Sequence, residues 1–283
     1  KFVISELTPE QIWGAVFEMV KLATGASDPY YYDKRQARQT AFQQLNRLSS
    51  SKLSWQQKLK LVIAGNIIDY SSARVVKKLA KNASYFDQVL SAAIEADLSI
   101  DCFNQFKNLV IDASPKSIVW LVDNDGEVVF DLWLIEKLAE KGHHVTIVGK
   151  PESASNDATV ADIEQVVEHS FFQFLPSKIH NGQVRIISSG SVTIGTNLHQ
   201  ATYEFANSVL DADLVISKGQ GNFFTTKGLN QDVFYLLMSK GVTAEVATGI
   251  AADQSQLIDG LILAYVPAGT HYPNTLANYY DSL

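Results

Sequence analysis

The sequence predicts an α/β protein in which a helical region precedes a Rossmann-like domain with a largely parallel, doubly wound sheet and flanking helices. Residues 1–114 carry apolar side chains at helical spacing, and little in them resembles a strand. From residue 115 to residue 283, short β-branched runs alternate with helical patterns, which is typical of βαβ units. The expected boundary between the two regions lies near residues 113–116.

The N-terminal region should form several helices. The first is expected at 11–23, where Ile12, Val16, Met19 and Val20 recur at helical spacing after the start signal Thr8-Pro9-Glu10. Further helices are expected at 34–48, 55–70, 85–96 and 102–113, and the basic run at 74–81 is typical of a solvated helix face.

The C-terminal region should alternate strands with helices. Strands are expected at 118–122, 145–148, 184–187, 214–216 and 243–246, with a further one at 261–266. Helices are expected at 128–140, 160–169, 198–209 and 233–239. Because the carboxyl ends of parallel strands share one edge of a sheet, polar residues that follow these strands should lie close together.

The composition excludes several classes of protein. The net charge of −7, with no compensating basic stripe, argues against a nucleic-acid partner. No apolar run approaches the length of a membrane span, and the visible N-terminus lacks a signal-peptide layout, so we expect a cytoplasmic protein without a membrane partner. The single cysteine, Cys102, excludes an internal disulfide and a multi-cysteine zinc site, and it should be a buried thiol.

Polar clusters follow four of the predicted strands. The first strand runs directly into Asp123-Asn124-Asp125-Gly126-Glu127, a sequence that is also common in strand-to-helix turns. Asn156-Asp157, the Ser188–Ser191 run and Lys218-Gly219-Gln220-Gly221-Asn222 follow the next three. Each cluster alone is compatible with a turn. Together they predict an oxygen-ligand site for Mg²⁺ or Mn²⁺ beside a glycine-rich cradle for phosphate.

Several common catalytic motifs are missing from the sequence. It contains no GxGxxG, no P-loop, no HExxH and no GxSxG, and its histidines show no metal-ligand spacing. Dinucleotide binding, P-loop chemistry and a serine-hydrolase triad therefore have no support.

A combination of motifs resembles one family along nearly the whole chain. These motifs are DPY…K at 28–34, GNIID at 65–69, DNxGE..FD at 123–131, NDAT at 156–159 and KGQGN at 218–222. In this order and spacing they resemble the metal-dependent damage-control phosphatases, also known as domain of unknown function 89. The resemblance implies a helical part, a Rossmann-like part, and hydrolysis of phosphomonoesters such as sugar phosphates or damaged phosphometabolites. The metal would be Mg²⁺ or Mn²⁺, with Co²⁺ or Ni²⁺ as further possibilities.

The resemblance also implies roles for individual residues. The metal ligands would be Asp123, Asn124 and Asp157, and the catalytic groups would be Asp123, Glu127 and Lys218, with Lys218 on the phosphate. A small phosphorylated substrate would be bound by Asn66, Asp69, Ser189, Gly219 and Asn222.

Two departures from the family pattern leave alternatives open. Many members have Glu where this chain has Phe224, and alanine is common at the position of Asp125. A non-catalytic relative that binds a phosphometabolite is therefore one alternative. A haloacid-dehalogenase-type phosphatase is the other, because Asp123-Asn124-Asp125-Gly126 fits a DxDG motif with Asp123 as nucleophile and Asp125 as acid/base.

Overall fold

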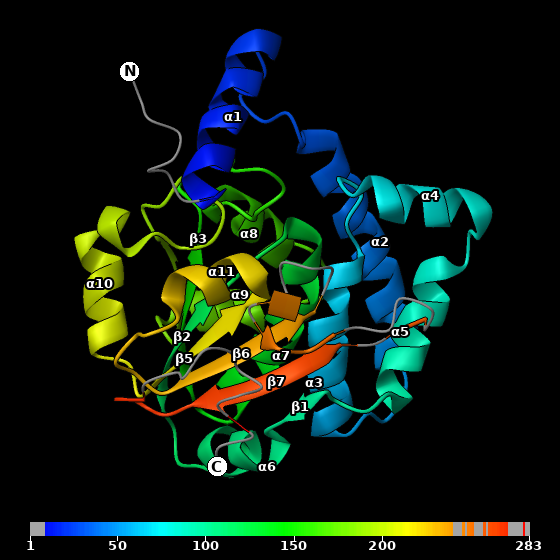
Figure 1. Cartoon of the computed structure of the whole chain (residues 1–283). Coiled ribbons are helices and arrows are strands. Elements are labelled where there is room, and N and C mark those ends of the chain that lie inside the picture. Colours follow the sequence, from blue (N-terminus) through cyan, green and yellow to red (C-terminus); the bar gives the residue numbers. More distant parts are fainter. Residues whose placement is uncertain are drawn as a thin grey trace.

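The computed structural model describes residues 9–239, 245–246, 248–251, 257–258, 260–270 and 280. A seven-stranded sheet forms its centre (Figure 1), in the order β1-β7-β6-β5-β2-β3-β4. Its strands are β1 (Ile100–Asp101), β2 (Ser117–Leu121), β3 (His144–Gly149), β4 (Val184–Ser188), β5 (Leu214–Lys218), β6 (Val233–Met238) and β7 (Leu261–Val266).

The sheet is wound in two directions from β2. The chain moves outward through β3 and β4, and it then returns to place β5 and β6 on the other side of β2. All of these neighbours are parallel, as are β1 and β7, and among the described strands only β6 and β7 pair in antiparallel fashion. The order therefore reverses between β2 and β5, and such a switch point is where open α/β sheets bind ligands.

Helices surround the sheet. They are α1 (Pro9–Thr24), α2 (Tyr31–Ser49), α3 (Trp55–Ala64), α4 (Ala73–Lys81), α5 (Tyr85–Glu95), α6 (Phe103–Phe106), α7 (Asp125–Glu140), α8 (Val160–Val167), α9 (Leu175–His180), α10 (Tyr203–Leu210) and α11 (Gly219–Thr226). Gly65–Ile67 and Leu198–Gln200 are 3-10 turns, and Lys107–Ile111 is a π-helical turn. No helix in the described ranges is long and apolar enough to cross a membrane.

Local sequence signals account for the start of two of these helices. Ser54 and Gln57 form a reciprocal capping box at the start of α3. Thr159 and Asp162 do the same for α8, and this fixes the loop that joins β3 to α8. Helix α7 is buried along nearly its whole length because it packs between the sheet and helices α2 and α3.

The main predictions of the fold class are confirmed, and several elements differ. The segment predicted as a helix at 233–239 is strand β6, whose side chains are all buried. Of the strand predicted at 243–246, residues 243–244 lie outside the described ranges and residues 245–246 are helical. The helix predicted at 55–70 ends at Ala64, where the 3-10 turn begins. The N-terminal region also contributes a strand, β1, which pairs with β7 at the edge of the sheet.

Candidate active site

The switch point brings Asp123 against the first residue of α11. Asp123 follows β2, and Gly219 follows β5 with φ +77°, in the left-handed region that favours glycine. A Cβ atom placed on Gly219 would lie 1.8 Å from Asp123 Oδ2. Only glycine therefore permits this approach, which sets the positive end of α11 beside the Asp123 carboxylate.

The loop after β3 lies alongside the loop after β2. Asn124 and Asp157 pair as an isolated antiparallel bridge, and the Ala158 N–H donates to the Asp123 carbonyl oxygen at 2.9 Å. Asp157 is buried, which raises its pKa, although the nearby Lys150 opposes this effect. The three residues predicted as metal ligands thus lie on two adjacent loops at one edge of the sheet.

Glu127 lies beneath this edge and is fully buried. Its Oε1 accepts hydrogen bonds from Asn124 Nδ2 at 2.7 Å and from Asn66 Nδ2. Asn66 Nδ2 also donates to Asp123 Oδ2 at 3.3 Å. The 3-10 turn after α3 therefore delivers Asn66 to the site, where it joins the helical region to the two acidic residues.

Lys218 points into the protein below Glu127. Its Nζ donates to Glu127 Oε2 at 2.9 Å, to Asp131 Oδ1 at 2.9 Å and to the Val62 carbonyl oxygen at 3.1 Å. Burial favours the neutral amine, but the two carboxylates outweigh it and hold the pKa of Lys218 above its ordinary value. The ammonium is fully buried among these partners, and its direct contact with phosphate stays a prediction.

A second buried lysine, Lys150 at the end of β3, was not among the predicted site residues. Its Nζ lies 3.6 Å from Asp157 Oδ2 and donates to the carbonyl oxygens of Thr193, at 2.7 Å, and Gly195. Burial lowers the pKa of Lys150, and Asp157 and Asp123 offset part of that effect. A charged residue directly after a buried strand was the sequence signal that could have identified it.

The other residues predicted to bind substrate are Asn222, Asp69 and Ser189, and they lie on three different segments of the chain. Asn222 donates to the carbonyl oxygens of Val122, at 2.8 Å, and Lys218, at 2.9 Å, and so ties α11 to the end of β2. Asp69 accepts from Asn156 Nδ2 at 3.1 Å, which links the helical region to the Asp157 loop. The buried Ser189 donates its backbone N–H to the Gly149 carbonyl oxygen at 2.9 Å.

The donor set suits a hard divalent cation by its chemistry. Asp123 and Asp157 offer carboxylate oxygens, and Asn124 donates through its nitrogen to Glu127, which leaves its carbonyl oxygen as the ligand atom. Within the described ranges, no three His, Cys, Asp or Glu side chains form a metal cluster by themselves. The carboxamide of Asn124 would therefore be an essential member of the site.

The sequence profile of the family described as "Damage-control phosphatase ARMT1-like domain" matches residues 5–255. The chain belongs to this family. A damage-control phosphatase of Pyrococcus horikoshii, PH1575, is 30% identical over 219 residues, which cover 76% of this chain and 69% of the relative. A damage-control phosphatase of Archaeoglobus fulgidus is 24% identical over 228 residues, covering 76% of this chain and 70% of the relative.

A crystal structure of a DUF89 family protein from P. horikoshii has the same fold, with a TM-score of 0.67 and 28% sequence identity. The match covers 82% of this chain and 75% of that protein. Together with the named relatives, membership in the damage-control phosphatase family supports a phosphatase role for this chain.

The haloacid-dehalogenase alternative gains no support from the family match or from the geometry. That mechanism needs Asp125 as an acid/base beside Asp123. The Asp125 carboxylate instead accepts from Arg38 Nε of α2 at 2.6 Å. Burial raises the pKa of Asp125 to about 7, and Asp162 adds to the rise while Arg38 opposes it.

Phe224, at the position where we expect many family members to have Glu, lies on α11 and is half-buried. Its ring contacts that of Phe223, with 5.9 Å between the ring centroids.

Proposed function

We propose that this chain is a divalent-metal-dependent phosphatase that hydrolyses small phosphomonoesters, such as sugar phosphates or damaged phosphometabolites. One observation carries the proposal. The approach of Gly219 to Asp123 places the start of α11 against the acidic loop after β2, at the switch point of the sheet. Membership in the damage-control phosphatase family supports the reaction type.

Asp123, Asn124 and Asp157 would hold the cation, for which Mg²⁺ or Mn²⁺ is the expected species and Co²⁺ or Ni²⁺ a possible substitute. Such a cation would supply positive charge against the phosphoryl oxygens. The start of α11 has no side-chain cap, so its backbone N–H groups can bind and orient a phosphate.

The buried residues would act by positioning. Lys218 holds one oxygen of Glu127, and Asn66 and Asn124 hold the other, so the Glu127 carboxylate is fixed from both sides. Asn222 attaches α11 to β2 and thereby keeps the phosphate-binding end of the helix at a fixed distance from Asp123. The single buried cysteine is compatible with a reducing compartment, so we keep the cytoplasm as the proposed location.

The test is hydrolysis of p-nitrophenyl phosphate by metal-stripped protein that is titrated with Mg²⁺, Mn²⁺, Co²⁺ and Ni²⁺. Turnover should require metal and should be lost in Asp123→Ala and Asp157→Ala. Asp112→Ala is the matched control, because Asp112 is an exposed carboxylate paired with Lys107 far from the site. It should retain wild-type turnover.

Two other outcomes would contradict the proposal. Turnover that persists in both site variants would mean that these carboxylates do not hold the functional metal. Tight metal binding without turnover of p-nitrophenyl phosphate or of a panel of sugar phosphates would favour the non-catalytic relative, for which the Phe224 departure is the sequence evidence.

A further inference from the structure

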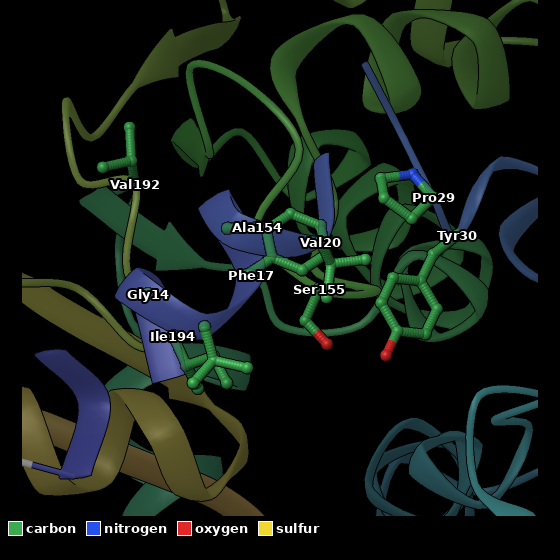
Figure 2. Close-up of a pocket in the computed structure, with 10 residues that line it drawn as sticks. Gly14, Phe17, Val20, Pro29, Tyr30, Ala154, Ser155, Val192 and Ile194 are labelled. Atoms are coloured by element: carbon green, nitrogen blue, oxygen red, sulfur yellow. The ribbon is translucent and has the colours of Figure 1, made fainter. Parts of the chain in front are cut away.

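An apolar cavity of about 200 Å³ lies between α1 and the loops that follow β3 and β4 (Figure 2). Figure 2 shows Val192 and Ile194 at one side of it, Pro29 and Tyr30 at the other, and Phe17 and Val20 of α1 between them. Ser155 also lines the cavity.

The cavity shares its walls with the proposed active site. Ser155, which lines the cavity, stands two residues before Asp157 in the same loop. Val192 and Ile194 flank Thr193, whose carbonyl oxygen accepts from Lys150 Nζ at 2.7 Å. Lys150 in turn lies 3.6 Å from Asp157. Ile194 also lies against the first turn of α11, because a Cβ atom placed on Gly221 would be 3.0 Å from Ile194 Cγ2. The cavity therefore borders the start of α11, where the phosphate is proposed to bind.

The character and size of the cavity restrict what can bind there. Among the lining residues that the structure describes, none carries a charged side chain, and only Tyr30 and Ser155 carry a side-chain hydroxyl group. Phe17 and Tyr30 stack with their ring centroids 5.8 Å apart, which gives one wall a flat aromatic surface. A dry cavity of roughly 150 Å³ accepts benzene, so this one has room for a single ring or a short alkyl chain. Sugar hydroxyls would lose hydrogen bonds to water in it.

We propose that this cavity binds an apolar group on the alcohol half of the substrate. Among the small phosphomonoesters of the proposed function, the preferred substrates are then those with a ring or a short alkyl chain beyond the phosphate. The inference rests on the proposed function, because it places the phosphate at the start of α11 and the apolar group under α1.

The first test is a series of ethyl, butyl and hexyl phosphate, in which the leaving group has nearly constant chemistry. Burial of each added methylene should raise kcat/KM by about fourfold until the cavity is filled. Val20→Trp should block the cavity and abolish this dependence on chain length. Leu22→Trp is the matched control, since Leu22 lies on the same helix, is 82% exposed and does not line the cavity. It should keep the dependence.

A second measurement separates this inference from the proposed function. Calorimetry in the presence of Mn²⁺ would compare methylphosphonate with butylphosphonate, neither of which can be hydrolysed. Tighter binding of butylphosphonate by the wild type and by Leu22→Trp, but not by Val20→Trp, would support the cavity even if no ester were turned over. Equal kcat/KM across the ester series, or equal affinity for the two phosphonates, would overturn it.

Discussion

Lys218→Met tests whether the buried ammonium stabilises the folded protein through its ion pairs with Glu127 and Asp131. The substitution keeps an unbranched side chain that is one atom shorter, and it leaves Glu127 and Asp131 without their shared cation. Both carboxylates are fully buried, and each lies 2.9 Å from Lys218 Nζ. Removing one partner of a buried ion pair costs about 3–5 kcal/mol, because a charge is left uncompensated in a medium of low polarity.

The raised pKa of Asp131 gives a second indication of how much stability an ionised carboxylate costs at this position. Burial raises it from 3.8 to about 6, even though Lys218 lowers it. A shift of this size corresponds to roughly 3 kcal/mol of stability lost as the pH rises through the folded pKa, since the folded state then gives up a proton that it binds more tightly than the unfolded state. Without Lys218 the pKa should rise further. The destabilisation by Lys218→Met should therefore be large at pH 8 and smaller at pH 5, where the carboxyl is protonated.

Urea unfolding, followed by tryptophan fluorescence, measures the loss of unfolding free energy caused by Lys218→Met at pH 5 and at pH 8. Lys137→Met is the matched control, because Lys137 lies on α7 in a partly exposed pair with Glu140. Its loss should cost less than about 1 kcal/mol at either pH. A loss below about 1 kcal/mol for Lys218→Met at pH 8, or an equal loss at both pH values, would refute the reasoning.

Three further predictions concern the site and its surroundings. Gly219→Ala should abolish turnover in the phosphatase assay, because its Cβ would displace Asp123. Gly182→Ala is the control, because Gly182 has a similar φ of +78° and open space around it. This variant should lose about 1–2 kcal/mol of stability and remain active. Asp125→Asn should change kcat/KM by less than about threefold, since the carboxylate binds Arg38; a loss of several orders of magnitude would restore the haloacid-dehalogenase mechanism. Because burial raises the pKa of Cys102, its alkylation should be at least about 100-fold slower in native protein than in urea, and rapid labelling of the native thiol would contradict its burial.

The edge of the sheet was predictable because two general rules agree there. In the sequence, polar residues come soon after each buried strand. In a parallel sheet, the carboxyl ends of the strands lie at the same edge. The structure places Asp123 and Asp157 in the loops after β2 and β3, and Lys218 at the last position of β5. Strand β6 was misread because its run of buried apolar residues has no period of two, and a short run of this type does not distinguish a strand from a buried helix.

The buried partners of the site were harder to predict. Glu127 and Asp131 stand four residues apart on α7, a spacing that puts both on one face of a helix and so allows a single cation to serve both. That signal was present in the sequence. The contact of Lys218 with the Val62 carbonyl oxygen was not, because it depends on how α3 packs against the sheet.

Strand β1 has a consequence for the order of events on the ribosome. Ile100 pairs with Ile262, so the partner strand is made about 160 residues after β1. At roughly 5–20 residues per second, that interval is about 10–30 s. For most of this time, until β6 is made, helix α3 has neither of the strands on which it packs in the finished protein, β6 and β7. The nascent N-terminal region therefore exposes apolar surface for seconds, and chaperones that bind such surface should associate with it until β7 emerges.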